Sequence, residues 1–174
     1  GRWSTTVAEN RQPYFTEWSG SFGPIFKGQP IFFWLFFFGS IYLFYNMISR
    51  ILMKKEKIML TLSYVIFLFF LIFSRYSSAS TFNGTNTISM TVYVLGFIIF
   101  LGCFGYYYYI CYKRSEEHRL KNIEMGFIML FIFFFFSILA ARTAVRTIMV
   151  LVPSASIIIS YFAVTIFNDT KNIK

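Results

Sequence analysis

The sequence predicts an all-α protein, a polytopic helix bundle that crosses a membrane about five times. Hydrophobic residues make up 57% of the 174-residue chain and charged residues only 13%, whereas a soluble domain carries about 25% charged residues. Each of five stretches without any charge is close to the roughly 17–25 residues that a helix needs to cross the hydrocarbon core. These stretches are continuous rather than alternating, which excludes a transmembrane β-barrel. They comprise residues 31–49, 58–74, 88–112, 125–141 and 147–167.

The spans are joined by polar connectors whose charge predicts their side of the membrane. Residues 1–30, rich in glycine, proline and aromatic residues, are expected to form an external loop with one short helix. Connectors 50–57 and 113–121 are rich in lysine and arginine, so they should be cytoplasmic, as should the tail 168–174. The connector 75–87 has one arginine and no lysine and is expected outside. The net charge of +9 therefore points to anionic lipid headgroups as its partner, and not to nucleic acid.

One turn conflicts with this charge pattern. Arg142 and Arg146 lie between the fourth and fifth spans, on the side that should be poor in positive charge. Two long cations at a membrane boundary can simply reach to the headgroups. Alternatively, their four-residue spacing places both on one helical face, where two guanidinium groups would hold an anionic group such as a phosphate.

Few other residues point to chemistry. Glu9 is either a solvated loop carboxylate or a group beside an active site. Cys103 and Cys111 are too far apart along one predicted helix for a disulfide, and are expected to pack as small apolar residues. The triplet at residues 83–85 matches the N-glycosylation acceptor pattern and is equally compatible with a turn. The only histidine, His118, lies in a cytoplasmic connector, so no histidine-based dyad is expected.

Two segments carry a resemblance to a known family. Residues 5–13 read TTVAENRQP, and residues 144–153 read AVRTIMVLVP. The first resembles the Ser/Thr-Val/Ile-x-Glu motif of the fifth external loop of the oligosaccharyltransferase catalytic subunit, which is often followed by Gln-Pro. The second resembles that family's Val-Arg followed by an apolar run that ends in proline. Both segments occur in the family's order, and both are predicted on the external side.

The resemblance implies an N-glycosylation enzyme that moves a glycan from a lipid-pyrophosphate donor to an acceptor asparagine in an Asn-x-Ser/Thr polypeptide. It implies that Glu9 contacts the acceptor carboxamide and that Thr6 shapes the loop. It further implies that Arg146 binds the donor pyrophosphate, and Arg142 is a weaker candidate for the same phosphate. A divalent metal, Mn²⁺ or Mg²⁺, is implied as cofactor, with its main ligands outside this part of the polypeptide.

The chain also departs from the family. The first-loop aspartate, the Asp-x-Asp metal ligands and the Trp-Trp-Asp motif are missing. The resemblance therefore covers the later membrane portion of the enzyme, and we expect a piece of a longer polypeptide that is inactive by itself. An additional helical hairpin between the two motifs suggests an archaeal-type variant.

Two other functions remain open at this point. Another polyprenyl-phosphate glycosyltransferase would share an arginine for lipid phosphate without needing an acceptor loop. A transporter or channel fragment would instead need broken helices and polar residues at mid-depth of the membrane. The uncharged span interiors, with Pro153 as their only proline, disfavour transport.

Overall fold

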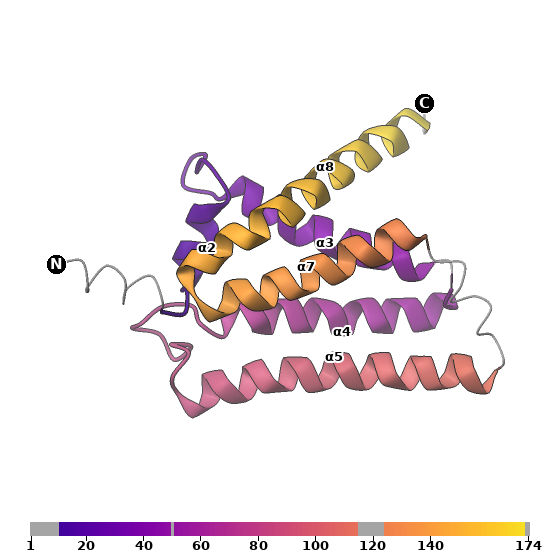
Figure 1. Cartoon of the computed structure of the whole chain (residues 1–174), viewed down its shortest axis with the longest axis horizontal. Helices are drawn as coiled ribbons and strands as arrows, with labels where there is room; N and C mark the ends of the chain where they lie inside the picture. The colour runs from indigo at the N-terminus through magenta and orange to yellow at the C-terminus, as the bar shows by residue number, and fades with distance from the viewer. Residues whose placement is uncertain (1–10, 50, 115–123, 173–174) are drawn as a thin grey trace. The chain divides into compact units, whose positions relative to one another are not determined.

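The computed structural model describes residues 11–49, 51–114 and 124–172 (Figure 1). Within these ranges no β-strand forms, and pairing is limited to two isolated bridges. The prediction of an all-α protein is confirmed. The helices are α2 (Phe15–Ser21), α3 (Ile31–Ser49), α4 (Lys54–Phe73), α5 (Thr87–Lys113), α7 (Met125–Thr143), the 3₁₀ turn η1 (Val145–Thr147) and α8 (Ile148–Asn172).

Five helices in the described ranges are long and apolar enough to cross a membrane: α3, α4, α5, α7 and α8, the last together with η1. Their outward faces are apolar as well, and large side chains such as Ile98, Phe136 and Met149 are exposed. An apolar exterior of this extent is unstable in water and is typical of a surface that faces lipid. The chain is therefore an integral, multi-pass membrane protein.

The helix boundaries differ from the expected spans mainly at the end of α8 and at the start of α4. Helix α8 continues to Asn172, so that residues 168–172 of the expected tail are helical. The start of α4 is also displaced. This helix begins at Lys54, four residues before the charge-free stretch that starts at residue 58. The backbone amide of Met53 donates a hydrogen bond to Oε2 of Glu56 at 3.2 Å, which satisfies a donor at the helix start. Lys57 then lies over the ring of Tyr45, 5.2 Å from its centroid. Local contacts thus allow charged residues to continue the helix beyond its apolar part.

Serine hydroxyls inside the spans have internal hydrogen-bond partners. Ser40 donates to the carbonyl oxygen of Phe37, and Ser63 donates to that of Leu60, each at 2.8 Å. Ser137 donates to the carbonyl oxygen of Phe133 at 2.7 Å. Because the hydrocarbon core offers no water, such bonds to the preceding turn let a polar side chain remain in a spanning helix.

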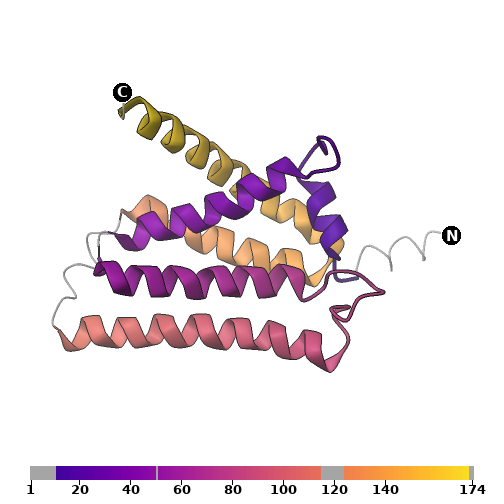
Figure 2. The same cartoon turned by 180° about the vertical axis from the view of Figure 1, so that it is seen from behind.

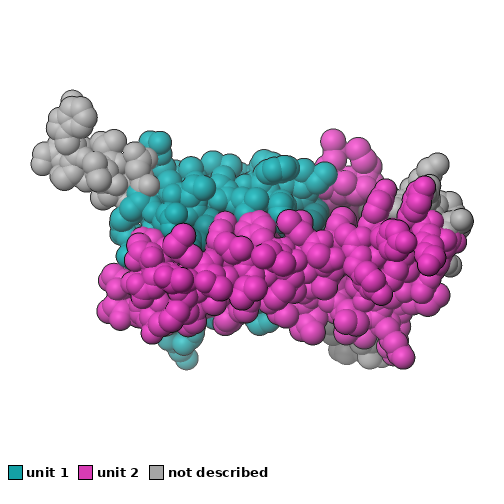
Figure 3. Space-filling view, turned by 90° about the horizontal axis from the view of Figure 1, so that it is seen from below, with its two compact units in different colours: residues 1–43, 130–174 teal, residues 44–129 magenta. Residues whose placement is uncertain are grey.

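The chain divides into two compact units, Gly1–Leu43 with Leu130–Lys174, and Phe44–Met129 (Figure 3). In the first unit, the ring of Phe36 packs on Phe134 with centroids 5.7 Å apart. Gly39 of α3 lies against α8, and a Cβ built on it would stand 3.1 Å from Cγ2 of Ile158. Small residues allow this close approach of spanning helices. The first unit therefore joins α3, α7 and α8 around an aromatic core, with α2 beside α8.

In the second unit, α4 and α5 run side by side (Figures 1 and 2). Aromatic rings fill its core: the centroids of Phe44 and Tyr64 are 4.4 Å apart, and those of Phe67 and Phe100 are 5.1 Å apart. At one end, Nη1 of Arg114 donates to Oε1 of Glu56 at 2.8 Å. This ion pair connects the residue that follows α5 to the first turn of α4.

Candidate functional site

The turn between α7 and α8 carries both arginines that the sequence singled out. Helix α7 ends at Thr143, and Ala144 takes an extended conformation before η1 begins at Val145. The hydroxyl of Thr147 lies 2.6 Å from the carbonyl oxygens of Ala140 and Ala144 and donates within this turn. The sequence therefore breaks the helix between the two arginines and starts a new one directly after them.

The two guanidinium groups have different surroundings. Arg142 is buried, with 7% of its surface exposed, and its Nη1 donates to Oε1 of Gln12 at 3.0 Å. Arg146 is exposed. The expectation that their four-residue spacing places both on one helical face is wrong, because Ala144 leaves the helix between them. Arg146 is thus the guanidinium of this turn that solvent or a headgroup reaches.

The described end of the opening loop lies on the same turn. The backbone amide of Val145, the residue next to Arg146, donates to the carbonyl oxygen of Arg11 at 3.0 Å. The following Gln12 accepts from Arg142, and Pro13 is buried. Segments 130 or more residues apart in the sequence therefore meet here, within the first unit.

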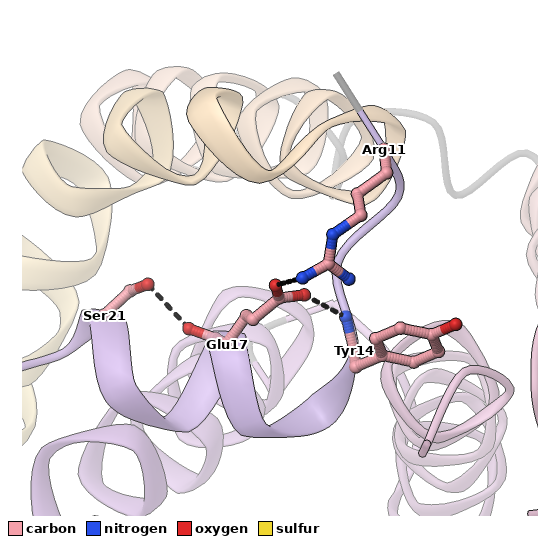
Figure 4. A network of polar contacts seen from close by, with 4 residues as sticks. All are labelled: Arg11, Tyr14, Glu17 and Ser21. Carbon is pink, nitrogen blue, oxygen red and sulfur yellow. Dashed lines mark hydrogen bonds and ion pairs between the residues drawn. The ribbon is translucent and has the colours of Figure 1, made fainter. Parts of the chain in front are cut away.

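The loop is also attached to α2 (Figure 4). Nη2 of Arg11 forms an ion pair and hydrogen bond with Oε1 of Glu17, and its guanidinium lies 5.4 Å from the ring centroid of Tyr14. Oε2 of Glu17 accepts from the backbone amide of Tyr14 at 2.7 Å, which satisfies a donor at the start of the helix. Ser21 donates to the carbonyl oxygen of Glu17 at 2.6 Å. The carboxylate of Glu17 is thus engaged in local structure.

Trp18 anchors this helix. Its side chain is fully buried. Nearby, Phe15 packs edge-on against Phe33 of α3, with ring centroids 5.5 Å apart. The burial of such aromatic side chains stabilises α2, which is too short to be stable as an isolated helix. The loop therefore leads into a helix, α2, that is held in place by its aromatic side chains.

Thr6 and Glu9 lie outside the described residues. The roles assigned to Thr6, Glu9, Arg142 and Arg146 remain predictions.

The expected divalent metal finds no ligand set among residues 11–49, 51–114 and 124–172, where no three His, Cys, Asp or Glu side chains gather. Cys103 and Cys111 are both on α5. A divalent ion is normally held by several oxygen or nitrogen ligands. The metal thus stays an implication of the resemblance, and the chemistry assigned to the described residues is hydrogen bonding and charge.

Sequence reasoning missed two contributors, Arg11 and Gln12. Both belong to the segment with the family resemblance, but neither was given a role. The only available signal was Pro13, which restricts the preceding Gln12 to extended conformations. The partners of Arg11 and Gln12 follow from tertiary structure alone.

A third arginine was placed outside on charge grounds, and the structure gives it a structural role. Arg75 follows α4 and is 9% exposed. It forms an isolated antiparallel bridge with Asn83, and its side chain packs against Gly84 in the connector. Arg75 therefore belongs to the folded connector of the second unit.

Comparisons of the chain with family models, curated proteins and solved structures returned no match. The resemblance of residues 5–13 and 144–153 to the oligosaccharyltransferase catalytic subunit therefore stands as a hypothesis, to be judged on the contacts that connect these segments.

Proposed function

We propose that this chain is the later membrane portion of an archaeal-type oligosaccharyltransferase, which transfers a glycan from a lipid-pyrophosphate donor to an acceptor asparagine. One observation carries the proposal: the hydrogen bond from the amide of Val145 to the carbonyl oxygen of Arg11. This bond joins the loop with the Thr6–Glu9 motif to the turn with Arg146. The first family-like segment ends at residues 11–13, and contact of these residues with the second segment supports a shared site.

The exposed guanidinium of Arg146 suits the leaving group of this reaction. In the transfer, the acceptor carboxamide nitrogen attacks the anomeric carbon of the glycan. The bond from this carbon to the pyrophosphate oxygen breaks, and the nitrogen loses a proton. Negative charge therefore develops on the pyrophosphate, and a guanidinium placed there stabilises it through two parallel hydrogen bonds. The membrane position of the turn fits a donor that is itself a lipid.

The acceptor side is assigned to Glu9. An amide nitrogen is a poor nucleophile because its lone pair is shared with the carbonyl group. A carboxylate that accepts hydrogen bonds from the amide N–H groups would reduce the conjugation of the lone pair with the carbonyl group. The nitrogen would then attack more readily. Thr6 would support the loop conformation. A bound divalent metal, supplied with ligands by the rest of the polypeptide, would add Lewis-acid stabilisation of charge.

The test uses the intact polypeptide in its native membranes, with a lipid-pyrophosphate glycan donor and an Asn-x-Thr peptide. Arg146→Ala should lower the transfer rate by about 10²–10³-fold, as the loss of one charge-stabilising donor does in other enzymes. Lys27→Ala is the matched control, since it removes another exposed cation of the same unit. Glu9→Gln keeps the side-chain size and should also slow transfer severely.

Three results separate the alternatives. Wild-type transfer rates in Arg146→Ala and Glu9→Gln would refute the proposed site. Glycan transfer that depends on Arg146 but ignores the peptide and Glu9 would identify another polyprenyl-phosphate glycosyltransferase. Solute flux through vesicles in the absence of any glycan transfer would identify a transporter.

A further inference from the structure

The opening loop is attached to the α7–α8 turn through two consecutive residues. Arg11 accepts a hydrogen bond at its carbonyl oxygen from Val145, and Gln12 accepts one at its side chain from Arg142, each at 3.0 Å. A single bond would leave the loop free to pivot. Two bonds at adjacent residues define both the position and the direction of the chain at this point.

Arg142 is placed for contact with the loop and not for contact with a headgroup. Only 7% of its surface is exposed, and it lies in the last turn of α7. A buried guanidinium is costly unless hydrogen-bond acceptors surround it. Oε1 of Gln12 is such an acceptor, at 3.0 Å from Nη1 of Arg142. The loop thus supplies a hydrogen-bond acceptor to the buried Arg142.

The loop is held from its other side as well. Arg11 pairs with Glu17 of α2, and α2 is anchored by the buried Trp18. The side chain of Arg11 thus connects this segment to α2, whereas the Arg11 carbonyl group and the Gln12 side chain connect it to the α7–α8 turn. Arg146, adjacent to Val145, is exposed next to this attachment.

We propose that Arg142 is a positioning residue that, through Gln12, docks the acceptor-side loop next to the exposed guanidinium of Arg146. This inference rests on the proposed function for its catalytic consequence, but the docking itself can be measured without any activity. In this role Arg142 touches neither the donor nor the acceptor. Its loss should move the loop and leave the affinity for the donor unchanged.

Docking has a direct protease readout. Trypsin cleaves the peptide bond after Arg11, whose carbonyl oxygen is the atom that bonds to Val145. In the intact polypeptide under native conditions, cleavage at this bond requires the loop to detach, so its rate follows the population of the open form. Cleavage after the exposed Lys27 provides an internal reference in the same unit.

Four variants make this readout specific. Arg142→Ala and Gln12→Ala should each increase the rate of cleavage after Arg11, relative to Lys27, by about tenfold or more. Gln12→Glu retains an acceptor for the guanidinium and should keep the protection. Arg146→Ala should also leave the protection unchanged. Because Gln12 is an exposed loop residue, Gln12→Ala remains informative even if Arg142→Ala fails to fold.

Activity measurements give the second readout. Arg142→Ala should raise KM for the Asn-x-Thr peptide and lower kcat, and leave KM for the lipid-pyrophosphate donor within twofold of wild type. Gln12→Glu, which retains an acceptor for Arg142, should have a KM for the peptide in the wild-type range. Arg146→Ala should instead raise KM for the lipid-pyrophosphate donor.

The outcomes separate the two proposals. Unchanged cleavage after Arg11 in both alanine variants would overturn the positioning role, whatever their activity. Faster cleavage together with weaker donor binding in Arg142→Ala would also overturn it, because Arg142 would then be a donor ligand. Faster cleavage in a polypeptide that transfers no glycan at all would support the docking and refute the proposed function.

Discussion

Gly96 of α5 lies so close to Phe70 of α4 that a Cβ built on the glycine would stand 3.0 Å from the Cβ of Phe70. This is the closest approach that a built Cβ reveals between these two helices within the second unit. Spanning helices gain little from the hydrophobic effect, because lipid is as apolar as their side chains, so their association depends on tight packing. The approach at Gly96 is therefore central to the α4–α5 pair.

Replacing Gly96 with leucine should destabilise this pair. We expect Gly96→Leu to cost about 1–3 kcal/mol, because the added side chain has to displace Phe70. Gly102→Leu is the matched control on the same helix, since a Cβ there would meet no atom within 4 Å. Unfolding in detergent with increasing denaturant measures both variants. Equal stability of the two would show that the close approach contributes nothing.

The connector after α4 depends on a glycine for two reasons. Gly84 has φ +82°, and a Cβ on it would stand 2.7 Å from Nη1 of Arg75. The left-handed backbone alone costs a non-glycine residue about 1–2 kcal/mol. Gly84→Ala should therefore destabilise the protein by more than this amount. Gly28→Ala isolates the backbone contribution, because Gly28 has φ +78° and open space around it.

Thermal unfolding of the two alanine variants checks this prediction. Gly84→Ala should lower the midpoint temperature further than Gly28→Ala does, because only Gly84 is packed against an arginine side chain. In an Arg75→Ala background, Gly84→Ala should lower the midpoint temperature only as much as Gly28→Ala does. If Gly84→Ala still lowers it further in that background, a clash with Arg75 is not the cause of the difference.

The ion pair between Arg114 and Glu56 should contribute little to stability. The side chain of Arg114 is 43% exposed and that of Glu56 is 15% exposed, and pairs that water reaches contribute about 0.2–1 kcal/mol. A double-mutant cycle with Arg114→Ala and Glu56→Gln measures the coupling free energy. This coupling should decrease between low and high salt, as screening requires. A larger coupling that salt does not change would indicate a buried pair.

The orientation of α5 is a prediction from charge, and its two ends allow a direct test. With Cys103 and Cys111 replaced by alanine, Thr85→Cys should react with a membrane-impermeant maleimide added outside. Lys113→Cys should react only after the membrane is permeabilised. Both positions are exposed, so both are accessible to the reagent. The reverse labelling pattern would contradict the positive-inside assignment.

The boundaries of the spanning helices were the part of the fold most open to prediction from the sequence. The apolar run 31–49 became α3 with the same limits, because a charge-free stretch of spanning length has one stable backbone conformation in lipid. The start of α4 was predicted four residues late, because Lys54 and Glu56 are charged and yet helical. Composition locates where a helix enters the hydrocarbon core, whereas hydrogen bonds at its end decide where it begins.

The candidate site was less open to prediction. The sequence singled out Arg142 and Arg146 as a pair on the basis of helical spacing. The extended conformation of Ala144 separates them, so that one guanidinium is buried and the other is exposed. No local pattern indicates that break, since alanine is the residue that favours a helix most strongly.

By itself, then, the sequence determined that this protein is an all-α bundle with five spans, because the lack of charge over a length matching the bilayer is a local property of each segment. Only the tertiary structure decided that Gln12 meets Arg142 and that Arg11 meets Val145, across 130 or more residues of chain. Such contacts depend on how separate helices pack together. Packing is a property of all their surfaces at once and cannot be seen in any one segment.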